Sequence, residues 1–265
     1  MSAERADDAV RSRALALDRA LRLRASDRIE PFGWGSALYS DALPRVFEFN
    51  VLIVEGPCHD LDAATLDAEA ERLQGDGMLR HRRAFVDDEA LGARLQPGMI
   101  ALGWQARPIG LMIYRSPLDT AHDAVRVREV SLEALQEVHE QFLRMQSYGS
   151  DPDTVRQLLK ADAVMSRACG GRHFAGYHGE RAACFLSLYT DGEAAQIQAL
   201  ATLPDARRRG LAGEVIRVGV RTAVAAGRAP IAIAADDEVP WLRAIYERMG
   251  FAFVGRWWAF TRLPA

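Results

Sequence analysis

The sequence predicts an α/β fold in which helices flank a mixed β-sheet. Three observations indicate it: short apolar runs alternate with longer stretches of helical periodicity, glycine and proline stand at the junctions, and one pattern of elements occurs twice. The length of 265 residues leaves room for about two compact units. We therefore expect two lobes, residues 1–120 and 125–265, joined near the polar stretch 117–123.

The first lobe begins with a leucine-rich and arginine-rich stretch that predicts a helix over residues 9–25. Residues 31–45 contain two prolines and two glycines and are expected to be irregular. The other expected elements are, in order, a strand, a helix, a short strand, a weak helix and a strand, at residues 46–54, 60–74, 81–86, 91–101 and 109–114.

The second lobe has sharper signals. Ser131 and Asp151-Pro152 each begin a helix, because serine and aspartate favour the N-cap and proline the first turn. His178-Gly179 and Asp191-Gly192 are typical of turns between strands. Strands are expected at 125–130, 172–178, 182–189, 194–202 and 231–235, further helices at 208–226 and 240–249, and a last extended segment at 251–261.

An internal repeat supports the two-lobe plan. Pro57 and Gly103 are 46 residues apart, and so are Pro204 and Gly250. After each proline the expected order is helix, strand, acidic triplet, helix, glycine and strand, although the triplets stand two residues out of step. We infer either a duplicated unit or convergence on half of the same fold.

Charge and composition exclude several classes of function. The formal net charge of −3 gives no basic field that would draw nucleic acid. The three cysteines form no CxxC pair and the six histidines show no zinc spacing, so we expect reduced thiols and no metal. The N-terminus lacks an apolar leader and no apolar run is long enough to cross a membrane. We expect a cytoplasmic protein that binds neither nucleic acid nor membrane, and a homodimer stays open.

Residues 202–213, with the sequence TLPDARRRGLAG, carry the clearest chemical signal. They lead from a strand into a helix, whose first N–H groups lack internal acceptors and whose dipole adds positive charge there. Small residues at Gly210, Ala212 and Gly213 would let a phosphate approach the backbone, and three arginines add full charge. The segment predicts a pyrophosphate site. The alternative interpretation is an exposed basic turn.

The segment resembles the acyl-CoA loop of the GNAT N-acetyltransferase superfamily, Q/R-x-x-G-x-G/A, which RRRGLA at 207–212 matches. A strand ending in proline at 200–204 and a tyrosine ahead of a Gly-Phe pair at 246–251 agree with the same family. The resemblance covers residues 125–261, whereas the first half is only weakly similar and resembles a degenerate GNAT-like lobe. It implies that acetyl-CoA, or another acyl-CoA, binds in a cleft between splayed strands.

The resemblance also implies roles for individual residues. The backbone of Leu200, Ala201 and Thr202 would hydrogen-bond the pantetheine arm, and a backbone N–H of this strand would stabilise charge on the thioester oxygen. Tyr246 would donate a proton to the leaving thiolate, although its spacing also fits an ordinary buried helix face. The N–H groups expected to hold the pyrophosphate belong to Arg207, Arg208, Arg209, Gly210, Leu211, Ala212 and Gly213.

Two positions depart from the family pattern. Many members place a glutamate base eleven residues ahead of the loop, where this chain has Gln196, and an amide cannot usefully accept a proton near neutral pH. Glu193 is nearby but is expected in a turn. Many members also have an asparagine seven residues before the tyrosine, where this chain has Val239. A base that acts through water, or an amine whose pKa falls by desolvation, stays open.

The first lobe lacks a comparable loop. Residues 60–76 hold six acids and one arginine, whereas residues 205–221 hold two acids and five arginines. An acidic helix start repels a pyrophosphate, so we expect the first lobe to support the fold, contact a second copy or wall the substrate cleft. Trp257 and Trp258 would line an acceptor site or lie in a core and an interface. The acidic triplet 236–238 would attract a cationic amine or form a solvated turn.

The function expected from these observations is an acyl-CoA-dependent N-acyltransferase. Its donor would be acetyl-CoA in the first place, its acceptor a primary amine of a small molecule or a protein, and transfer would be direct. The alternative is an acyl-CoA-binding sensor or scaffold with weak or no turnover, which Gln196 favours.

Overall fold

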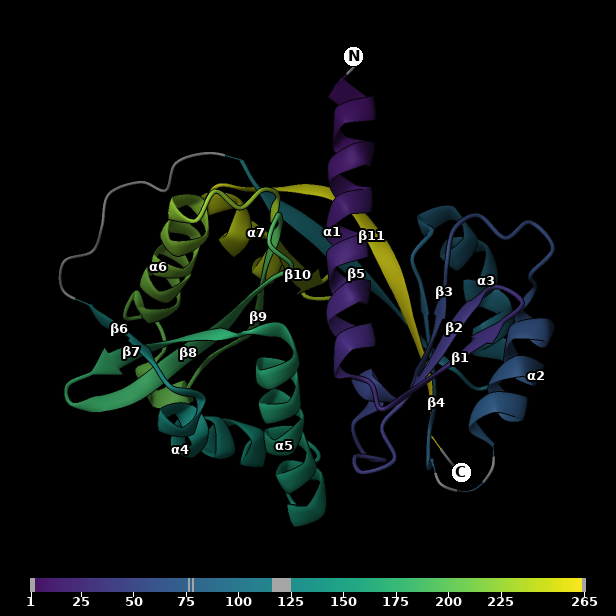
Figure 1. The fold of residues 1–265 in the computed structure, drawn as a ribbon, viewed down its shortest axis with the longest axis horizontal. Helices are drawn as coiled ribbons and strands as arrows, with labels where there is room; N and C mark the ends of the chain where they lie inside the picture. Colours follow the sequence, from purple (N-terminus) through teal and green to yellow (C-terminus); the bar gives the residue numbers. More distant parts are fainter. Residues whose placement is uncertain (1–2, 76, 78, 116–124, 264–265) are drawn as a thin grey trace.

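One mixed sheet of 11 strands runs through the molecule in the computed structural model, which describes residues 3–75, 77, 79–115 and 125–263 (Figure 1). The strand order is β1-β2-β3-β4-β11-β5-β10-β9-β8-β7-β6. Helices cover both faces: Phe174 and Leu186 pack against α6, while Ala175 and Phe185 on the opposite face pack against α4. The predicted α/β class, with helices flanking a mixed sheet, is confirmed.

The first lobe has five strands. Its helices begin at aspartate caps, since Asp62 accepts a hydrogen bond from Thr65 N and Asp88 from Leu91 N. Its elements are α1 (Ala3–Ala25), β1 (Arg28–Phe32), β2 (Gly35–Tyr39), the 3₁₀ turn η1 (Phe47–Phe49), β3 (Val51–Val54), α2 (Ala63–Gln74), β4 (Arg82–Val86), α3 (Glu89–Ala101) and β5 (Gln105–Tyr114).

The second lobe contains the remaining strands and shows the predicted caps. Ser131 accepts a hydrogen bond from Ala134 N, and Asp151 accepts from Asp153 N and Thr154 N. Its elements are β6 (Arg126–Val130), α4 (Leu132–Arg144), α5 (Pro152–Cys169), β7 (Arg172–His178), β8 (Arg181–Thr190), β9 (Ala195–Thr202), the 3₁₀ turn η2 (Pro204–Ala206), α6 (Leu211–Ala225), β10 (Ile231–Asp236), α7 (Pro240–Arg248) and β11 (Phe251–Arg262).

Three local expectations were wrong. Residues 31–39 are not irregular, because they contribute to the β1–β2 hairpin, whereas residues 40–45 are irregular as expected. Pro31 lies in an edge strand, and a side chain at Gly35 would come within 2.0 Å of the Ile53 carbonyl oxygen. The strand expected from residue 46 starts only at Val51, because the Asn50 side chain holds the preceding chain in a turn. The helix expected from residue 208 starts at Leu211 instead.

The two lobes exchange their last strands. β11 lies between β4 and β5 of the first lobe, and β5 in turn pairs with β10 of the second lobe; all three contacts are antiparallel. The strands on the two sides of the β11–β5 pair are arranged in the same way. β1-β2-β3-β4 on one side matches β7-β8-β9-β10 on the other, and β3 runs parallel to β4 as β9 runs parallel to β10. Elements β1 to β5 thus correspond to β7 to β11, and the repeat in the sequence predicts this for β4 and β5 with β10 and β11. The expected boundary at 117–123 lies outside the described residues.

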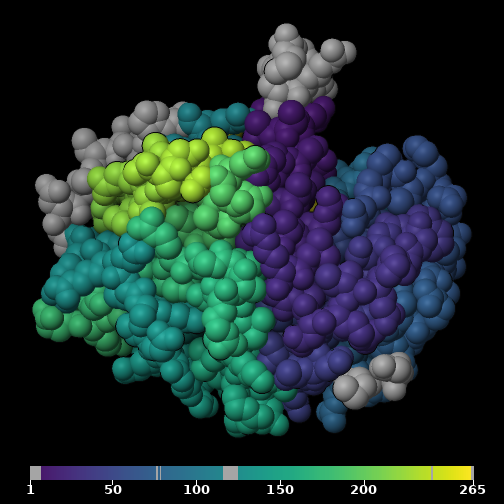
Figure 2. Space-filling view, viewed as in Figure 1, coloured from purple at the N-terminus to yellow at the C-terminus, as the bar shows by residue number. Residues whose placement is uncertain are grey.

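Helix α1 occupies the seam between the lobes (Figure 1; Figure 2, purple). Leu17 and Leu21 are fully buried in a cluster that includes Phe49 of η1 and Met165 of α5. Burying one leucine side chain contributes about 1.5–3 kcal/mol, so α1 holds the lobes together and fixes its polar residues at the seam.

Candidate active site

Strands β9 and β10 separate along their length, and a cavity opens between them. They pair in parallel only from Ala195 to Ile197, opposite Ile231 to Ile233. The cavity that follows has a volume of about 340 Å³. Its lining residues come from both lobes and are Asp18, Arg22, Gln196, Ile197, Gln198, Ala199, Leu200, Ile233, Ala234, Leu242, Tyr246 and Trp257.

An irregularity in β9 exposes its backbone to this cavity. The register with β8 shifts between Phe185 and Ser187, and Ala199 at the shift has a positive φ of 53°. From residue 198 onward, β9 also has no strand partner on its β10 side within the described residues. This open edge can form backbone hydrogen bonds with an extended acyl arm, and its N–H groups can stabilise a charged oxygen.

The loop at residues 207–213 follows directly and lies at the start of α6. Gly210 is the N-cap with a φ of 78° and offers no side chain to cap the helix. Arg207, Arg208 and Arg209 are exposed, and Arg208 also has a positive φ of 60°. Because Arg208 and Gly210 have positive φ, the helix cannot begin before Leu211. The first N–H groups of α6 are thereby available to an anion, as a pyrophosphate site requires.

The glycines of this loop leave room for a ligand. A Cβ atom at Gly210 would meet nothing nearer than a methyl group of Val125 at 3.9 Å. Leu211 is buried in the core, so only its backbone can take part in binding. Because the helix N-terminus, the exposed arginines and this open space coincide, the residues present fit a pyrophosphate group.

Tyr246 of α7 reaches the same cavity. Its side chain is 4% exposed, and burial raises its pKa to about 12, so the phenol stays protonated near neutral pH. Within the described chain, no group forms a hydrogen bond with its hydroxyl. A protonated tyrosine that lines a cavity can donate a proton to a leaving group bound there.

Gln196 is buried beside the cavity, and its amide is bound to the first lobe. Its Nε2 donates a hydrogen bond to Asp18 Oδ1 at 2.9 Å, and its Oε1 has no hydrogen-bond partner. Asp18 was not among the residues expected at the site. The available signal was a charged residue beside Leu17 and Leu21 on the buried side of a helix, four positions before Arg22.

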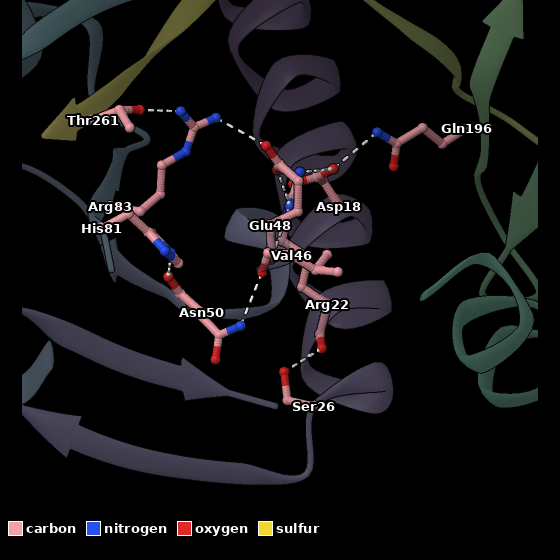
Figure 3. Close-up of polar contacts among 10 residues, drawn as sticks. All are labelled: Asp18, Arg22, Ser26, Val46, Glu48, Asn50, His81, Arg83, Gln196 and Thr261. Carbon is pink, nitrogen blue, oxygen red and sulfur yellow. Dashed lines mark hydrogen bonds and ion pairs between the residues drawn. The ribbon is translucent and has the colours of Figure 1, made fainter. Parts of the chain in front are cut away.

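Asp18 is the first member of a chain of ion pairs, which Figure 3 shows. Arg22 Nε donates to Asp18 Oδ2 at 2.7 Å, and the guanidinium of Arg22 also donates to Glu48 at 2.7 Å. Arg83 donates to the other oxygen of Glu48 at 2.9 Å and to the Thr261 hydroxyl. Burial disfavours the charged form of Glu48, but Arg83 and Arg22 outweigh it and hold the pKa of its carboxyl below the usual value.

A second cavity of about 300 Å³ adjoins the first. The two share Arg22, Gln198 and Ala199. Its walls come from α1 and the segment around η1 in the first lobe and from α4, α5, β8 and β9 in the second. Most of the lining residues are apolar or aromatic: Val46, Phe49, Leu143, Leu158, Ala161, Met165, Tyr189 and Ala199. The first lobe therefore walls a cavity beside the open edge of β9, one of the three roles that its sequence allowed.

The other candidate residues are now placed. Trp257 lines the first cavity, whereas Trp258 is buried in the first-lobe core. The acidic triplet is a turn whose carboxylates pair with Arg107 and Arg256, and none of them lines that cavity. Among the described residues, no three His, Cys, Asp or Glu side chains gather as a metal site, and no helix is long and apolar enough to span a membrane.

Comparison with known proteins agrees with this geometry. Residues 133–251 match the model of the acetyltransferase (GNAT) family. No match was found among curated proteins.

Solved structures share the fold at low sequence identity. A conserved protein of unknown function from Staphylococcus epidermidis has a TM-score of 0.71 at 15% identity, over 91% of this chain and 95% of that one. A GCN5-related N-acetyltransferase from Kribbella flavida has a TM-score of 0.66 at 16% identity, over 96% of this chain and 95% of that one. A tandem GNAT protein from the clavulanic acid biosynthesis pathway has a TM-score of 0.51 at 12% identity, over 76% and 68%. Residues 133–251 of this two-lobed chain form a domain of the GNAT acetyltransferase family.

Proposed function

We propose that the protein is an acyl-CoA-dependent N-acyltransferase that carries an acetyl group from acetyl-CoA to a primary amine of a small molecule or a protein. The main support is that three features occur together. They are the loop at 207–213 at the start of α6, the edge of β9 that β10 leaves unpaired, and the cavity beside that edge, which the protonated Tyr246 lines. In this proposal residues 125–265 carry the donor site, and residues 1–120 support it and wall the acceptor side.

Each of these features has a role in direct transfer. The N–H groups of residues 208–213 hold the pyrophosphate, whereas the N–H expected from Arg207 already donates to the Pro204 carbonyl oxygen. The backbone of Leu200, Ala201 and Thr202 aligns the acyl arm. A backbone N–H of β9 stabilises the carbonyl oxygen while the amine attacks. Tyr246 donates a proton to the departing sulfur. Acyl-CoA and an amine are then the partners, the proposed location is the cytoplasm, and no metal, nucleic acid or membrane takes part.

Calorimetric titration with acetyl-CoA tests the donor site. Gly210→Glu places a carboxylate in the loop. We expect it to abolish binding, because the carboxylate repels the pyrophosphate and its side chain fills the space beside Gly210. Gly227→Glu is the matched control, because Gly227 also has a positive φ, 69°, with open space around it, at the far end of α6. Both variants carry similar backbone strain, so loss of binding in both, or in neither, would contradict the assignment of the loop.

The alternative is an acyl-CoA sensor or scaffold, and Gln196 at the position of the base favours it. Release of free thiol from acetyl-CoA in the presence of aliphatic, aromatic and peptide amines distinguishes the two. Turnover supports the transferase, whereas loop-dependent binding without turnover of any amine supports the sensor.

A further inference from the structure

The side-chain amide of Gln196 lacks one hydrogen-bond partner. The side chain is 6% exposed, its Nε2 is bound to Asp18, and its Oε1 is a buried acceptor without a donor. Leaving such an acceptor unsatisfied costs about 1–3 kcal/mol. A ligand that brings an N–H group to this place would remove that cost.

Asp18 adds the negative charge that Gln196 lacks, and it lines the same cavity as Tyr246 and Ala199. Its Oδ1 accepts from Gln196 at 2.9 Å and from Arg22 at 3.3 Å, and its Oδ2 accepts from Arg22 at 2.7 Å. An ionised carboxylate can accept about four hydrogen bonds, so one further donor can be bound.

The position of Asp18 is fixed from the first lobe. Arg22 is held by Glu48, which is held by Arg83, and the guanidinium groups of Arg22 and Arg83 both lie over the ring of Phe85, at 4.7 and 4.9 Å from its centroid. Figure 3 shows Asp18 between this network and Gln196. A carboxylate held on two sides is pre-organised for a third partner.

Other acids near the cavities are less suited. Both oxygens of Glu48 are engaged by arginines. Asp87 is close to Asp18, but it does not line either cavity. Asp162 lies 3.0 Å from His139 and lines the second cavity, but it does not line the first cavity, which contains Tyr246.

We propose that Asp18, a residue of the first lobe, binds the acceptor amine and takes its proton, while Gln196 Oε1 accepts a second N–H of that amine. The inference rests on the proposed function. The amine reacts in its neutral form. As its nitrogen forms the bond to the acetyl carbon, the thioester C–S bond breaks and the nitrogen loses one proton to the Asp18 carboxylate. Tyr246 gives one proton to the sulfur and regains one from solvent, and Asp18 releases its proton to solvent.

The second cavity indicates the kind of amine. Its volume of about 300 Å³ corresponds to about ten waters at their share of liquid volume, and its walls are mainly apolar. A compact amine with an apolar body fits it, with the nitrogen at Asp18 and the body beside Phe49 and Met165. We choose 2-phenylethylamine as the probe.

The test compares Asp18→Asn with the double variant Asp18→Asn/Gln196→Glu in acetylation of 2-phenylethylamine, followed by thiol release and product mass. Asparagine keeps the shape and can still accept from Gln196, so the single variant should fold and bind acetyl-CoA like the wild type. We expect its kcat to fall about 10²-fold or more, the usual contribution of a general base. The double variant places a carboxylate at residue 196, the other partner of the same hydrogen bond, and its kcat should be at least tenfold higher than that of the single variant. Asp87→Asn replaces a neighbouring carboxyl group that lines neither cavity and is the control, with kcat retained.

Each outcome decides the question. Loss in the single variant with recovery in the double variant supports the proposal, because a purely structural role would not return with a relocated charge. An Asp18→Asn enzyme with wild-type kcat overturns the role of Asp18 but leaves the proposed transferase function intact. The same holds if Asp18→Asn loses acetyl-CoA binding, or if only Asp87→Asn loses kcat. A wild type that binds acetyl-CoA but acetylates neither the probe nor any amine of the panel overturns the transferase together with this inference.

Discussion

Two ionisable groups at opposite ends of β4, the buried His81 and the half-buried Asp87, should make stability depend on pH in opposite directions. Burial, together with the negative charge of Asp18, raises the pKa of Asp87 from 3.8 to about 7. Burial, aided by Arg83 and Arg82, lowers the pKa of His81 from 6.5 to about 4. His81 is stacked on Phe47 with ring centroids 3.8 Å apart, and its Nε2 lies 3.2 Å from the Asn50 carbonyl oxygen.

The signs follow from which state binds the proton more tightly. Between pH 3.8 and about 7, Asp87 is protonated in the folded protein and ionised in the unfolded chain, so stability falls as pH rises, by about 4 kcal/mol in all. Between pH 6.5 and about 4, His81 is neutral in the folded protein and charged in the unfolded chain, so stability falls as pH decreases, by about 3 kcal/mol. From pH 4 to 6.5 the two contributions largely cancel in the wild type.

Single variants should separate the contributions of Asp87 and His81 to the pH dependence of stability. Asp87→Asn should gain stability relative to the wild type as pH rises from 4 to 7, by about 4 kcal/mol. His81→Phe should lose stability relative to the wild type as pH rises from 4 to 6.5, by about 3 kcal/mol. Phenylalanine keeps the ring on Phe47, and the Asn50 carbonyl keeps its hydrogen bond from Gln74.

Urea unfolding of each protein at several pH values from 4 to 7.5 measures these differences, provided that the m-values agree. The double variant is the control, because the two positions are about 20 Å apart along the strand and their effects should add. An Asp87→Asn curve that runs parallel to the wild type across this range would show that Asp87 is ionised when folded, and the reasoning would fail.

Two further predictions concern Tyr246 and the core of the first lobe. Tyr246→Phe should lower kcat about 10²-fold and leave the Kd for acetyl-CoA unchanged, as measured by thiol release and calorimetry; an unchanged kcat would make Tyr246 a core residue only. Gly92→Ala should destabilise by about 2–3 kcal/mol, since a Cβ there would lie 2.0 Å from Trp258 Cδ1. Thermal unfolding measures this against Ala93→Ser on the exposed side of α3, and equal melting temperatures would show that the indole moves aside without cost.

The parts of the site that the sequence predicted are local. The loop at 207–213 and the helix caps at Ser131 and Asp151 depend on residues a few positions apart, so their spacing carries the information. Asp18 and Gln196 are 178 positions apart, and their hydrogen bond arises only because α1 packs in the seam between the lobes. The pattern of residues within α1 does not predict that Asp18 lies next to Gln196. The hairpin at residues 28–39 was missed for a related reason, because its edge strand tolerates Pro31, and proline usually argues against a strand.

The exchange of strands makes the two lobes one structural unit. β10, which forms one side of the first cavity, has β5 of the first lobe as its other neighbour, so without the first lobe that edge would be open to solvent or to another chain. β11 follows helix α7 of the second lobe in sequence, yet it buries Trp258 and Phe260 in the core of the first lobe. A second lobe expressed alone would expose these aromatic side chains as well as the open strand edge. The first half therefore has a physical role even without a phosphate loop: it completes the sheet that carries the proposed donor site, and through α1 it brings Asp18 to the cavity that Tyr246 lines.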